Sequence, residues 1–548
     1  MPTNFPGSID DLSAMVPSSG AAVTAKLGVP IAGGRHDDHH RNLGDAIEAV
    51  ETSLLPMLQT FNVKAYGAVG NNVALDTAAI QATIDAASAA GGGIVYVPPG
   101  TYKVTYTGTP LTTLGMPAVT PAITMRSNVH LVGTPGSIIQ AVNPGVGPIV
   151  AVIATATGNR QSNFKIRDLT IDGGYAGSTE QFQPAIYLGP DNNFVIEGCE
   201  LRNCSGKGIM LVSQLGGAPN LIANNFWIRN NFIHDNASNA IGLDRGATDF
   251  EVSGNHIKDC RAPGTGVEAI ISTGLPPVRG LYERNIIQNY GPIYIGDNGP
   301  SHIVVRDNII IGPVSPLNPG INLGVGALKH ILCEGNIVDM SAGVSGTTGG
   351  RPLVIEPDVA GATDIIIRGN ILIAAPTPAT AVLLVAGAAG SATGIVIADN
   401  TLSGGTGGPP GSGTEVLRIA GSGVANVQVH GNTFINNTGQ LISLNAEAIA
   451  NGRIFDNPGL NPVMGTNPNT AATITPAVPA TTVAYANGTG FDVDIYITAH
   501  AAATCTVSIA GVALGVIAVG ALGTYFLPAG QSITLTYTSA PTWKWMGR

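Results

Sequence analysis

The sequence is poor in charged side chains. Asp, Glu, Lys and Arg make up 11% of its 548 residues, against about 25% in ordinary globular proteins. The formal net charge is -10, and no run of Lys or Arg stands out. Proteins that bind nucleic acid neutralise its phosphates with clustered basic side chains. The composition therefore argues against a nucleic-acid partner, although single Arg and Lys side chains remain available to an anionic polymer.

Cysteine is scarce, and long apolar runs are missing. The five cysteines are Cys199, Cys204, Cys260, Cys333 and Cys505. Their number is odd and no CxxC or Cys/His zinc spacing occurs, so we expect small buried apolar side chains rather than disulfides. Gly and Pro interrupt the apolar stretches, so no transmembrane helix is predicted. Residues 1–16 lack a basic segment followed by an apolar one, so no secretory signal is predicted.

Glycine, by contrast, is abundant. It accounts for 73 residues, roughly 13% of the chain against the usual ~7%. The apolar content of 44% is enough to fill a core, which argues against disorder. The chain is too long for one compact core, so several domains or a long array of repeats is expected. These features favour a turn-rich β protein.

One short motif returns along the chain: an apolar strand, a corner that ends in Asn, and a second apolar strand. Residues 250–260, FEVSGNHIKDC, are one copy. The corner asparagines are Asn231, Asn255, Asn285, Asn308, Asn336, Asn370, Asn400 and Asn432. Two earlier copies carry Leu169 and Cys199 at the same place. Successive corners are 23 to 34 residues apart, and a period of about 20 to 50 residues indicates a solenoid.

We therefore predict an all-β fold, a parallel β-solenoid in which each repeat is one coil of short strands. In such a stack the corner asparagines form a column, and their side-chain amides bond from coil to coil. We assign these asparagines to the fold and not to an active site.

The segment that opens the array resembles a known family. Residues 61–104 are similar to the start of the pectate-lyase-like right-handed β-helix, which occurs in many phage tailspikes and polysaccharide-degrading enzymes. The matching motifs are Tyr66-Gly67-Ala68, Asp76–Gln81, Gly91–Gly93 and Pro98–Tyr102. Leu75 departs from the pattern, because the family usually has a second Asp there. The resemblance implies a right-handed β-helix but no particular chemistry, since members include lyases, hydrolases and inactive binders.

Within this opening segment we expect one capping helix over residues 76–89. Asp76 is its predicted N-cap, and Ile80 and Ile84 share its apolar face.

Upstream of the β-helix, residues 1–34 are predicted to be an extended arm that docks onto a larger particle. Residues 35–60 are predicted to form a short oligomerising helix, whose apolar side chains are spaced as a coiled-coil seam. His36 and His40 extend that seam backwards. In a trimer their side chains would meet at the axis, and binding of a transition metal there is one interpretation. A polar helix start is the favoured interpretation, and neither a metal nor another cofactor is predicted.

The body of the β-helix is assigned to residues 61–465, and residues 466–548 to a linker and a C-terminal β-sandwich. Turns fall about every 8 to 12 residues in the last part, which is typical of a sandwich. Trp543 and Trp545 alternate and are expected to pack in its interior.

Two further resemblances imply a role. The segment HDDHHRNLGDAIEAVE, residues 36–51, is similar to one near the start of many tail proteins from phages of actinobacteria. The last module resembles C-terminal β modules of phage tail proteins. Together they imply a virion tail spike or minor tail protein. It would be a homotrimer, attached to other tail proteins by its N-terminus, that binds polysaccharide at the host surface without inserting into a membrane.

The candidate catalytic residues are outward carboxylates on successive coils. We aligned the strands that follow the corners, which places Val267 in an inward row and Glu268 one coil above Gly242. Asp244 then lies roughly 8 Å from Glu268 on the diagonal, within the about 6.5–9.5 Å of inverting glycosidases. In this reading Glu268 is the general acid and Asp244 the base.

The same alignment assigns Tyr294 as a sugar platform, and Arg245 and Asp297 as substrate-binding residues. Gly242 would leave room for the sugar. The alternatives are ordinary solvated side chains on a non-catalytic adhesin, and a polysaccharide lyase, for which Arg245 beside Asp244 is the only basic candidate that we identify.

Overall fold

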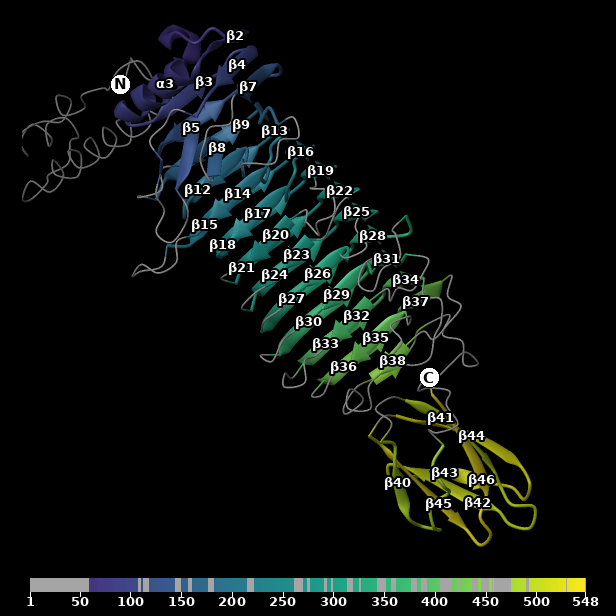
Figure 1. The fold of residues 1–548 in the computed structure, drawn as a ribbon. Coiled ribbons are helices and arrows are strands. Elements are labelled where there is room, and N and C mark those ends of the chain that lie inside the picture. Colours follow the sequence, from purple (N-terminus) through teal and green to yellow (C-terminus); the bar gives the residue numbers. More distant parts are fainter. Residues whose placement is uncertain are drawn as a thin grey trace, which may run out of the picture.

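The computed structural model confirms the predicted fold: a right-handed parallel β-helix forms the body of the chain (Figure 1). The structure describes residues 59–547 apart from 107–109, 112–117, 143–148, 156–159, 176–181, 214–220, 261–269, 274–275, 290–292, 297–298, 313–318, 325–326, 343–350, 356–360, 376–381, 386–391, 405–415, 421–423, 436–441, 445–452, 456, 458–474, 489–491 and 529. The predicted arm, nearly all of the predicted oligomerising helix, and His36 and His40 lie outside the described residues.

In the described part of the chain, the coils from β3 to β38 contribute strands to three parallel sheets, here called A, B and C, and the incomplete coils at the two ends add β1, β2 and β39. Sheet A has the strands β1 (Thr60–Asn62), β3 (Gly93–Tyr96), β6 (Val129–Val132), β9 (Ser162–Arg167), β12 (Asn192–Glu197), β15 (Ala223–Arg229), β18 (Ala247–Ser253), β21 (Val278–Glu283), β24 (Ser301–Arg306), β27 (Leu328–Glu334), β30 (Ala362–Arg368), β33 (Ala392–Ala398), β36 (Val424–His430) and β39 (Arg453–Phe455).

Sheet B follows the Asn corner of each coil. Its strands are β2 (Asn71–Leu75), β4 (Gly100–Val104), β7 (Ser137–Ala141), β10 (Thr170–Asp172), β13 (Glu200–Arg202), β16 (Phe232–His234), β19 (His256–Lys258), β22 (Ile286–Gln288), β25 (Ile309–Ile311), β28 (Ile337–Asp339), β31 (Ile371–Ile373), β34 (Thr401–Ser403) and β37 (Thr433–Ile435).

Sheet C closes the coil before the chain returns to sheet A. Its strands are β5 (Val119–Met125), β8 (Ile149–Thr155), β11 (Ile186–Leu188), β14 (Ile209–Val212), β17 (Ile241–Asp244), β20 (Ile270–Thr273), β23 (Ile293–Ile295), β26 (Ile321–Leu323), β29 (Leu353–Ile355), β32 (Val382–Val385), β35 (Leu417–Ala420) and β38 (Ile442–Leu444).

The corner asparagines form the predicted column between sheets A and B. From Asn231 onward, each side-chain amide donates to the side-chain oxygen of the next asparagine at 2.8–3.0 Å. The column continues one coil beyond the prediction, to Asn457. The side chains from Asn231 to Asn432 are buried, so each one left without a partner would cost about 1–3 kcal/mol. Their role is therefore structural, as predicted.

A second column, of aromatic rings, fills the interior behind sheet A. Phe164, Phe194, Phe226 and Phe250 stack from coil to coil with centroids 4.8–5.3 Å apart, and Tyr282 closes the stack edge-on at 5.4 Å. All are buried. One ring per coil supports the register of the coils by packing as well as by backbone hydrogen bonds.

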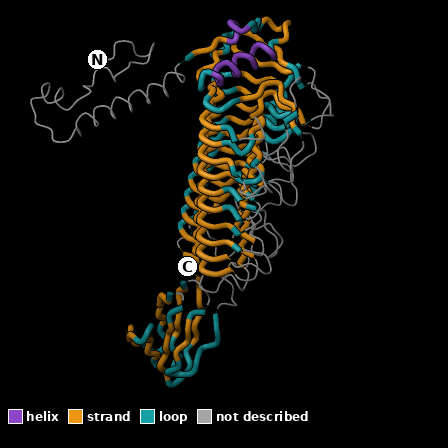
Figure 2. The backbone as a smooth tube through the Cα atoms, turned by 90° about the vertical axis from the view of Figure 1, so that its left-hand side faces the viewer, coloured by secondary structure: helices purple, strands orange, loops and turns teal. Residues whose placement is uncertain are grey.

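A helix covers the first coil, as Figure 2 shows at the end opposite the C-terminal module. The helix α3 (Thr77–Ala89) buries Ile80 and Ile84 as predicted. Asp76 is its N-cap residue, but its carboxylate makes no capping bond. It accepts hydrogen bonds from the backbone N–H groups of Val69 and Gly70 instead, and so fixes the preceding turn. A single 3-10 turn, η2 (Val63–Tyr66), precedes this region.

The C-terminal module consists of two antiparallel sheets (Figure 1). One has the strand order β40–β45–β42–β43 and the other β44–β41–β46. The strands are β40 (Ala484–Ala486), β41 (Val493–Thr498), β42 (Cys505–Ile509), β43 (Val512–Ile517), β44 (Leu522–Leu527), β45 (Ser532–Tyr537) and β46 (Thr542–Gly547). Trp543 and Trp545 are buried against Tyr485, which confirms that they pack the module.

All five cysteines are free and buried, as predicted. Burial raises the pKa of the Cys199 thiol to about 12, so this side chain remains a neutral apolar group near neutral pH. Within the described part of the chain, no helix is both long and apolar enough to cross a membrane.

Candidate functional site

The predicted catalytic pair, Asp244 and Glu268, was assigned to outward positions of sheet C. The inward row runs through Ile186, Ile209, Ile241, Ile270, Ile293 and Ile321. The next position of the same strands runs through Tyr187, Met210, Gly242, Ile271, Tyr294 and Asn322. Strand pairing therefore shows directly which residues are neighbours on this face.

One coil of the predicted alignment is wrong. Val267 was expected beside Ile241, but Ile270 pairs with Ile241, and Ile271 pairs with Gly242. Strand β20 begins three residues later than the apolar pattern suggested. Glu268 lies outside the described residues, and the diagonal of roughly 8 Å from Asp244 loses its basis because it assumed the earlier register. The Asp244–Glu268 pair stays a prediction.

Asp244 itself is held in an ion pair that the sequence did not predict. The Nζ atom of Lys207 lies 2.6 Å from Oδ2 of Asp244, and the two side chains are only 10% and 16% exposed. Lys207 stands just before β14, and Asp244 ends β17, the next strand of the same sheet. The lysine stem therefore spans one strand spacing, about 4.8 Å, on the outer face of sheet C.

Gly242 makes that path possible. A Cβ atom at this position would lie 2.6 Å from Nζ and 2.7 Å from Cδ of Lys207. The expectation that Gly242 leaves room for a sugar is thus wrong, because the lysine stem occupies the space. Burying an ion pair costs desolvation that its attraction often only balances. The pair is therefore weak evidence for stability. It places a largely buried ammonium and carboxylate on the outer side of sheet C.

Of two other predicted residues, Tyr294 belongs to the same outward row, and Arg245 is next to Asp244 in the chain. Arg245 directly follows Asp244, is half-buried, and has a left-handed backbone with φ of 67°. Tyr294 is half-buried two strands along the outward row, about 10 Å from Gly242. Its ring lies close over Gly296 and Gly324, which have no side chains to displace it. Asp297 lies outside the described residues.

A second charged cluster, on sheet B, was missed by the sequence analysis. Glu200 accepts hydrogen bonds from Thr170 and Arg202 and contacts His234, while Arg202 also donates to Asp172. A shallow depression of about 260 Å3 adjoins Glu200. In this cluster each charged group already binds another.

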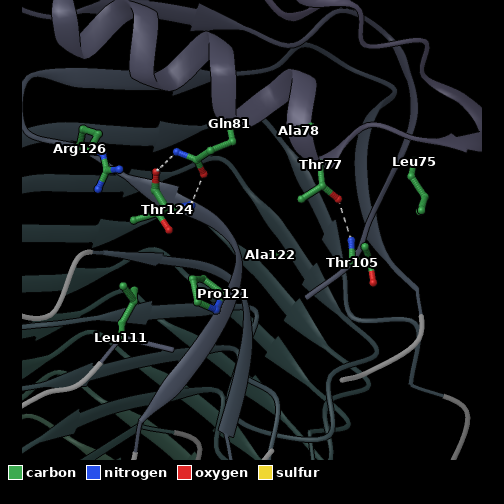
Figure 3. A pocket seen from close by; sticks show the side chains of 10 residues that line it. All are labelled: Leu75, Thr77, Ala78, Gln81, Thr105, Leu111, Pro121, Ala122, Thr124 and Arg126. Atoms are coloured by element: carbon green, nitrogen blue, oxygen red, sulfur yellow. Dashed lines mark hydrogen bonds between the residues drawn. The ribbon is translucent and has the colours of Figure 1, made fainter. Parts of the chain in front are cut away.

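The helix cap carries a cavity of about 510 Å3 (Figure 3). Its lining comprises Leu75, Thr77, Ala78, Gln81, Thr105, Leu111, Pro121, Ala122, Thr124 and Arg126. The Gln81 amide bonds both backbone groups of Thr124, and the Thr77 hydroxyl accepts from the Thr105 N–H. The described residues that line this cavity include no carboxylate.

Sequence reasoning missed Lys207 for a definite reason. The predicted pair was chosen from outward positions within strands. Lys207 precedes its strand, and its side chain reaches to the next coil. The signal available was the sequence KGIMLV aligned with NAIGLD, in which a lysine precedes one strand and an aspartate ends the next. Among the described residues, no group of three or more His, Cys, Asp or Glu side chains is placed to hold a metal ion.

Two family models match parts of the chain. The model described as right-handed β-helix region matches residues 154–342. The model described as rhamnogalacturonase A/epimerase, pectate lyase-like, matches residues 60–156. The matched residues run from the first coil through the coils that carry Lys207 and Asp244. They agree with the pectate-lyase-like fold implied by residues 61–104.

Curated relatives match about a third of the chain. Mannuronan C5-epimerase AlgE6 of Azotobacter vinelandii is 35% identical over 203 residues, which is 35% of this chain and 21% of that protein. Alginate lyase 7 of the same organism is 34% identical over 201 residues, again 35% of this chain and 21% of the relative. The match thus spans about a fifth of these relatives' own length.

A solved structure matches most of the chain. A tailspike protein of the E. coli bacteriophage HK620, in complex with a pentasaccharide, superposes with a TM-score of 0.58. The match covers 90% of this chain and 94% of the tailspike at 14% sequence identity. At that identity the likeness shows the fold alone.

Proposed function

We propose that this protein binds an acidic polysaccharide on the outer face of sheet C. The observation that carries the proposal is the Lys207–Asp244 pair, with Arg245 beside it and Tyr294 on the same face. Among the described residues, two cations, Lys207 and Arg245, lie next to one carboxylate, Asp244, in a chain of net charge -10.

The chemistry of the face suits sugar carboxylates. Arg binds a carboxylate through paired N–H donors, and Lys binds it as a point charge. The Tyr294 ring offers an apolar face to a pyranose ring, and it lies against Gly296 and Gly324, which have no side chains. The relatives named for mannuronan and alginate support the same class of ligand, since both names refer to polymers of uronic acids.

We also propose that the protein acts as a tail spike or minor tail protein of a phage. In this role it forms a homotrimer, attaches to other tail proteins by its N-terminal region, and contacts polysaccharide at the host cell surface. The N-terminal and C-terminal resemblances support this role, and the long β-helix provides a rigid body for it.

The reaction most compatible with the face is abstraction of the proton on the carbon beside a sugar carboxylate, with the Asp244 carboxylate as the base. Elimination then breaks the bond to the glycosidic oxygen, which leaves and takes up a proton from solvent, whereas epimerisation returns a proton to the opposite face of the same carbon. The Lys207 ammonium would stabilise the negative charge that develops on the sugar carboxylate. This observation favours elimination or epimerisation over the glycoside hydrolysis proposed for Asp244 and Glu268, which requires two carboxylates flanking one bond. A non-catalytic adhesin would use the same face for binding alone.

Binding and turnover with defined polysaccharides test these proposals. Mannuronan is the acidic probe, and a neutral glucan is the control. We expect calorimetric binding of mannuronan that weakens on Lys207→Met. Ultraviolet absorbance of an unsaturated product indicates elimination, and a change in sugar configuration detected by NMR indicates epimerisation. New reducing ends without absorbance, lost in Glu268→Gln, restore the hydrolase. Equal binding of acidic and neutral polymers contradicts the proposal.

A further inference from the structure

The cavity beneath the capping helix lies where helix α3 meets the edge of sheet C. Strand β5 is the outermost described strand of that sheet at the capped end, and α3 contacts it through a side chain. The Gln81 amide donates to the Thr124 carbonyl at 3.1 Å and accepts from the Thr124 N–H at 2.8 Å. Because a side chain and not a neighbouring strand makes this contact, a space of about 510 Å3 is left beside it. We call this space the cap cavity.

The lining of the cap cavity is mainly apolar. Its apolar residues are Leu75, Ala78, Leu111, Pro121 and Ala122. Of the polar residues, Gln81 is already bonded to Thr124. The Thr77 hydroxyl accepts from the Thr105 N–H. Small-molecule sites have volumes of about 300–1,000 Å3 and a similar lining. Leu75 is 60% exposed, so part of the apolar lining faces solvent and would be stabilised by being covered.

The charge of the cap cavity comes from Arg126, which is the one charged residue among the described lining residues. Its Nε atom donates to Oδ1 of Asp85 at 3.2 Å, and the same oxygen accepts from the Gln81 amide. The Arg126 and Asp85 side chains are 37% and 48% exposed, so their ion pair contributes little stability. A guanidinium has five N–H donors. Those on its two terminal nitrogens bond none of the described residues and are available to a ligand.

Figure 3 shows that Arg126 and Leu75 lie at opposite ends of the lining, with Pro121 between them. A ligand that fills the cap cavity therefore meets a cation at one end and apolar side chains along the rest of its length. Asp85 adjoins the guanidinium and disfavours a head group with two negative charges, because like charges repel at short range. A head group with a single negative charge suits the arrangement.

We propose that the cap cavity binds a carboxylic acid with a short aliphatic tail. The carboxylate accepts paired N–H donors from the terminal nitrogens of Arg126, which is the geometry that a guanidinium offers to a carboxylate. The tail lies along the apolar lining toward Leu75, where its burial from water supplies most of the affinity. The bound molecule contacts both α3 and β5, so it should also raise the melting temperature of the chain.

Calorimetry of the full chain with octanoate tests the proposal. Methyl octanoate is the matched probe for the head group, because it has the same tail but an uncharged ester, as in the acyl chains of lipids. Octanoate should bind at least tenfold more tightly than methyl octanoate, since the ester loses a charged hydrogen bond. Hexanoate should bind roughly 15-fold more weakly than octanoate, because each buried methylene contributes about fourfold in affinity.

The variant Ala78→Phe fills the cap cavity. Ala78 is exposed on α3, so a larger side chain there occupies the cavity without entering the core. We expect octanoate binding to weaken at least tenfold. Ala82→Phe is the matched control, since Ala82 is exposed on the same helix and is not among the described lining residues. Arg126→Met should remove the preference for octanoate over methyl octanoate, and melting temperatures check that each variant is folded.

Two results overturn the proposal at once: no octanoate binding by the unaltered chain, or equal octanoate binding by Ala78→Phe and Ala82→Phe. Equal affinities of the unaltered chain for octanoate and methyl octanoate also overturn it, because Arg126 would then select no acid. The inference is independent of the polysaccharide proposal. Lys207 is not among the described lining residues, so Lys207→Met should leave octanoate binding unchanged.

Discussion

Two charged clusters lie on the same coils of the β-helix but on different sheets, and they differ in how their charges are satisfied. On sheet B, Glu200, Arg202 and Asp172 bind one another, with Thr170 and His234 completing the network. On sheet C, one lysine crosses a glycine to reach one aspartate. The first arrangement places one arginine between two carboxylates, whereas the second pairs one lysine with one aspartate and has a further arginine, Arg245, next in the chain. The comparison teaches that charge density alone does not mark a binding face.

The largest expected effect comes from removing the sheet C cation. Lys207→Met should weaken mannuronan binding by roughly ten- to a hundredfold, because a hydrogen bond to a charged group contributes about 1.5–3 kcal/mol. Calorimetry measures the loss. Arg202→Met is the matched control on sheet B and should leave the affinity unchanged. Equal losses in both variants would remove the distinction between the clusters.

A smaller effect is expected when the lysine is displaced rather than removed. In Gly242→Ala the new Cβ would meet Nζ and Cδ of Lys207, and the flexible stem should move off Asp244. We expect a loss of affinity by a few fold at nearly unchanged melting temperature. Gly488→Ala is the control, because a Cβ there meets nothing within 4 Å. Unfolding of the Gly242 variant would mean that the pair supports the fold.

Tyr294 extends the comparison along sheet C. An aromatic ring packed on an apolar face contributes about 0.5–1.5 kcal/mol, so Tyr294→Ala should weaken binding by roughly two- to tenfold. Tyr294→Phe retains the ring and should bind almost normally if stacking is its role. If both variants lose affinity equally, the hydroxyl and not the ring contacts the sugar.

The smallest expected effect is a pH dependence on sheet B. Partial burial raises the pKa of Glu200, but hydrogen bonds from His234 and Thr170 and the charge of Arg202 outweigh it, so its pKa lies below the ordinary 4.5. The stability this group adds is thus complete above pH 4.5 and is lost as the pH falls through the lowered pKa.

Melting temperatures of the unaltered chain and Glu200→Gln, followed from neutral pH downward, measure that contribution. The two curves should differ at neutral pH and converge in acid. A difference that grows on acidification would contradict the assignment.

The fold was predictable because its signal is repeated. The corner asparagines recur at one place per coil, because each side chain bonds to the neighbouring coils and must lie at the same position in each coil. The start of the β-helix was also predictable, since the helix that buries Ile80 and Ile84 is a local feature of the sequence.

The site was less predictable for two physical reasons. The segment between the corner and sheet C varies in length from coil to coil. The apolar alternation around Val267 therefore predicted a strand three residues before the observed one, which begins at Ile270. Lys207 contacts a residue of the next coil through its long flexible side chain. The residue pattern within one strand does not predict such a contact. Only the register between β14 and β17 brings it to Asp244.

The most direct test of the central claim is the affinity of the full chain for mannuronan, measured beside Lys207→Met and Arg202→Met under identical buffer conditions. The proposed function predicts binding that is lost with the lysine variant and kept with the arginine variant. No binding by the unaltered chain, or binding that survives Lys207→Met, would contradict an acidic-polysaccharide site on sheet C.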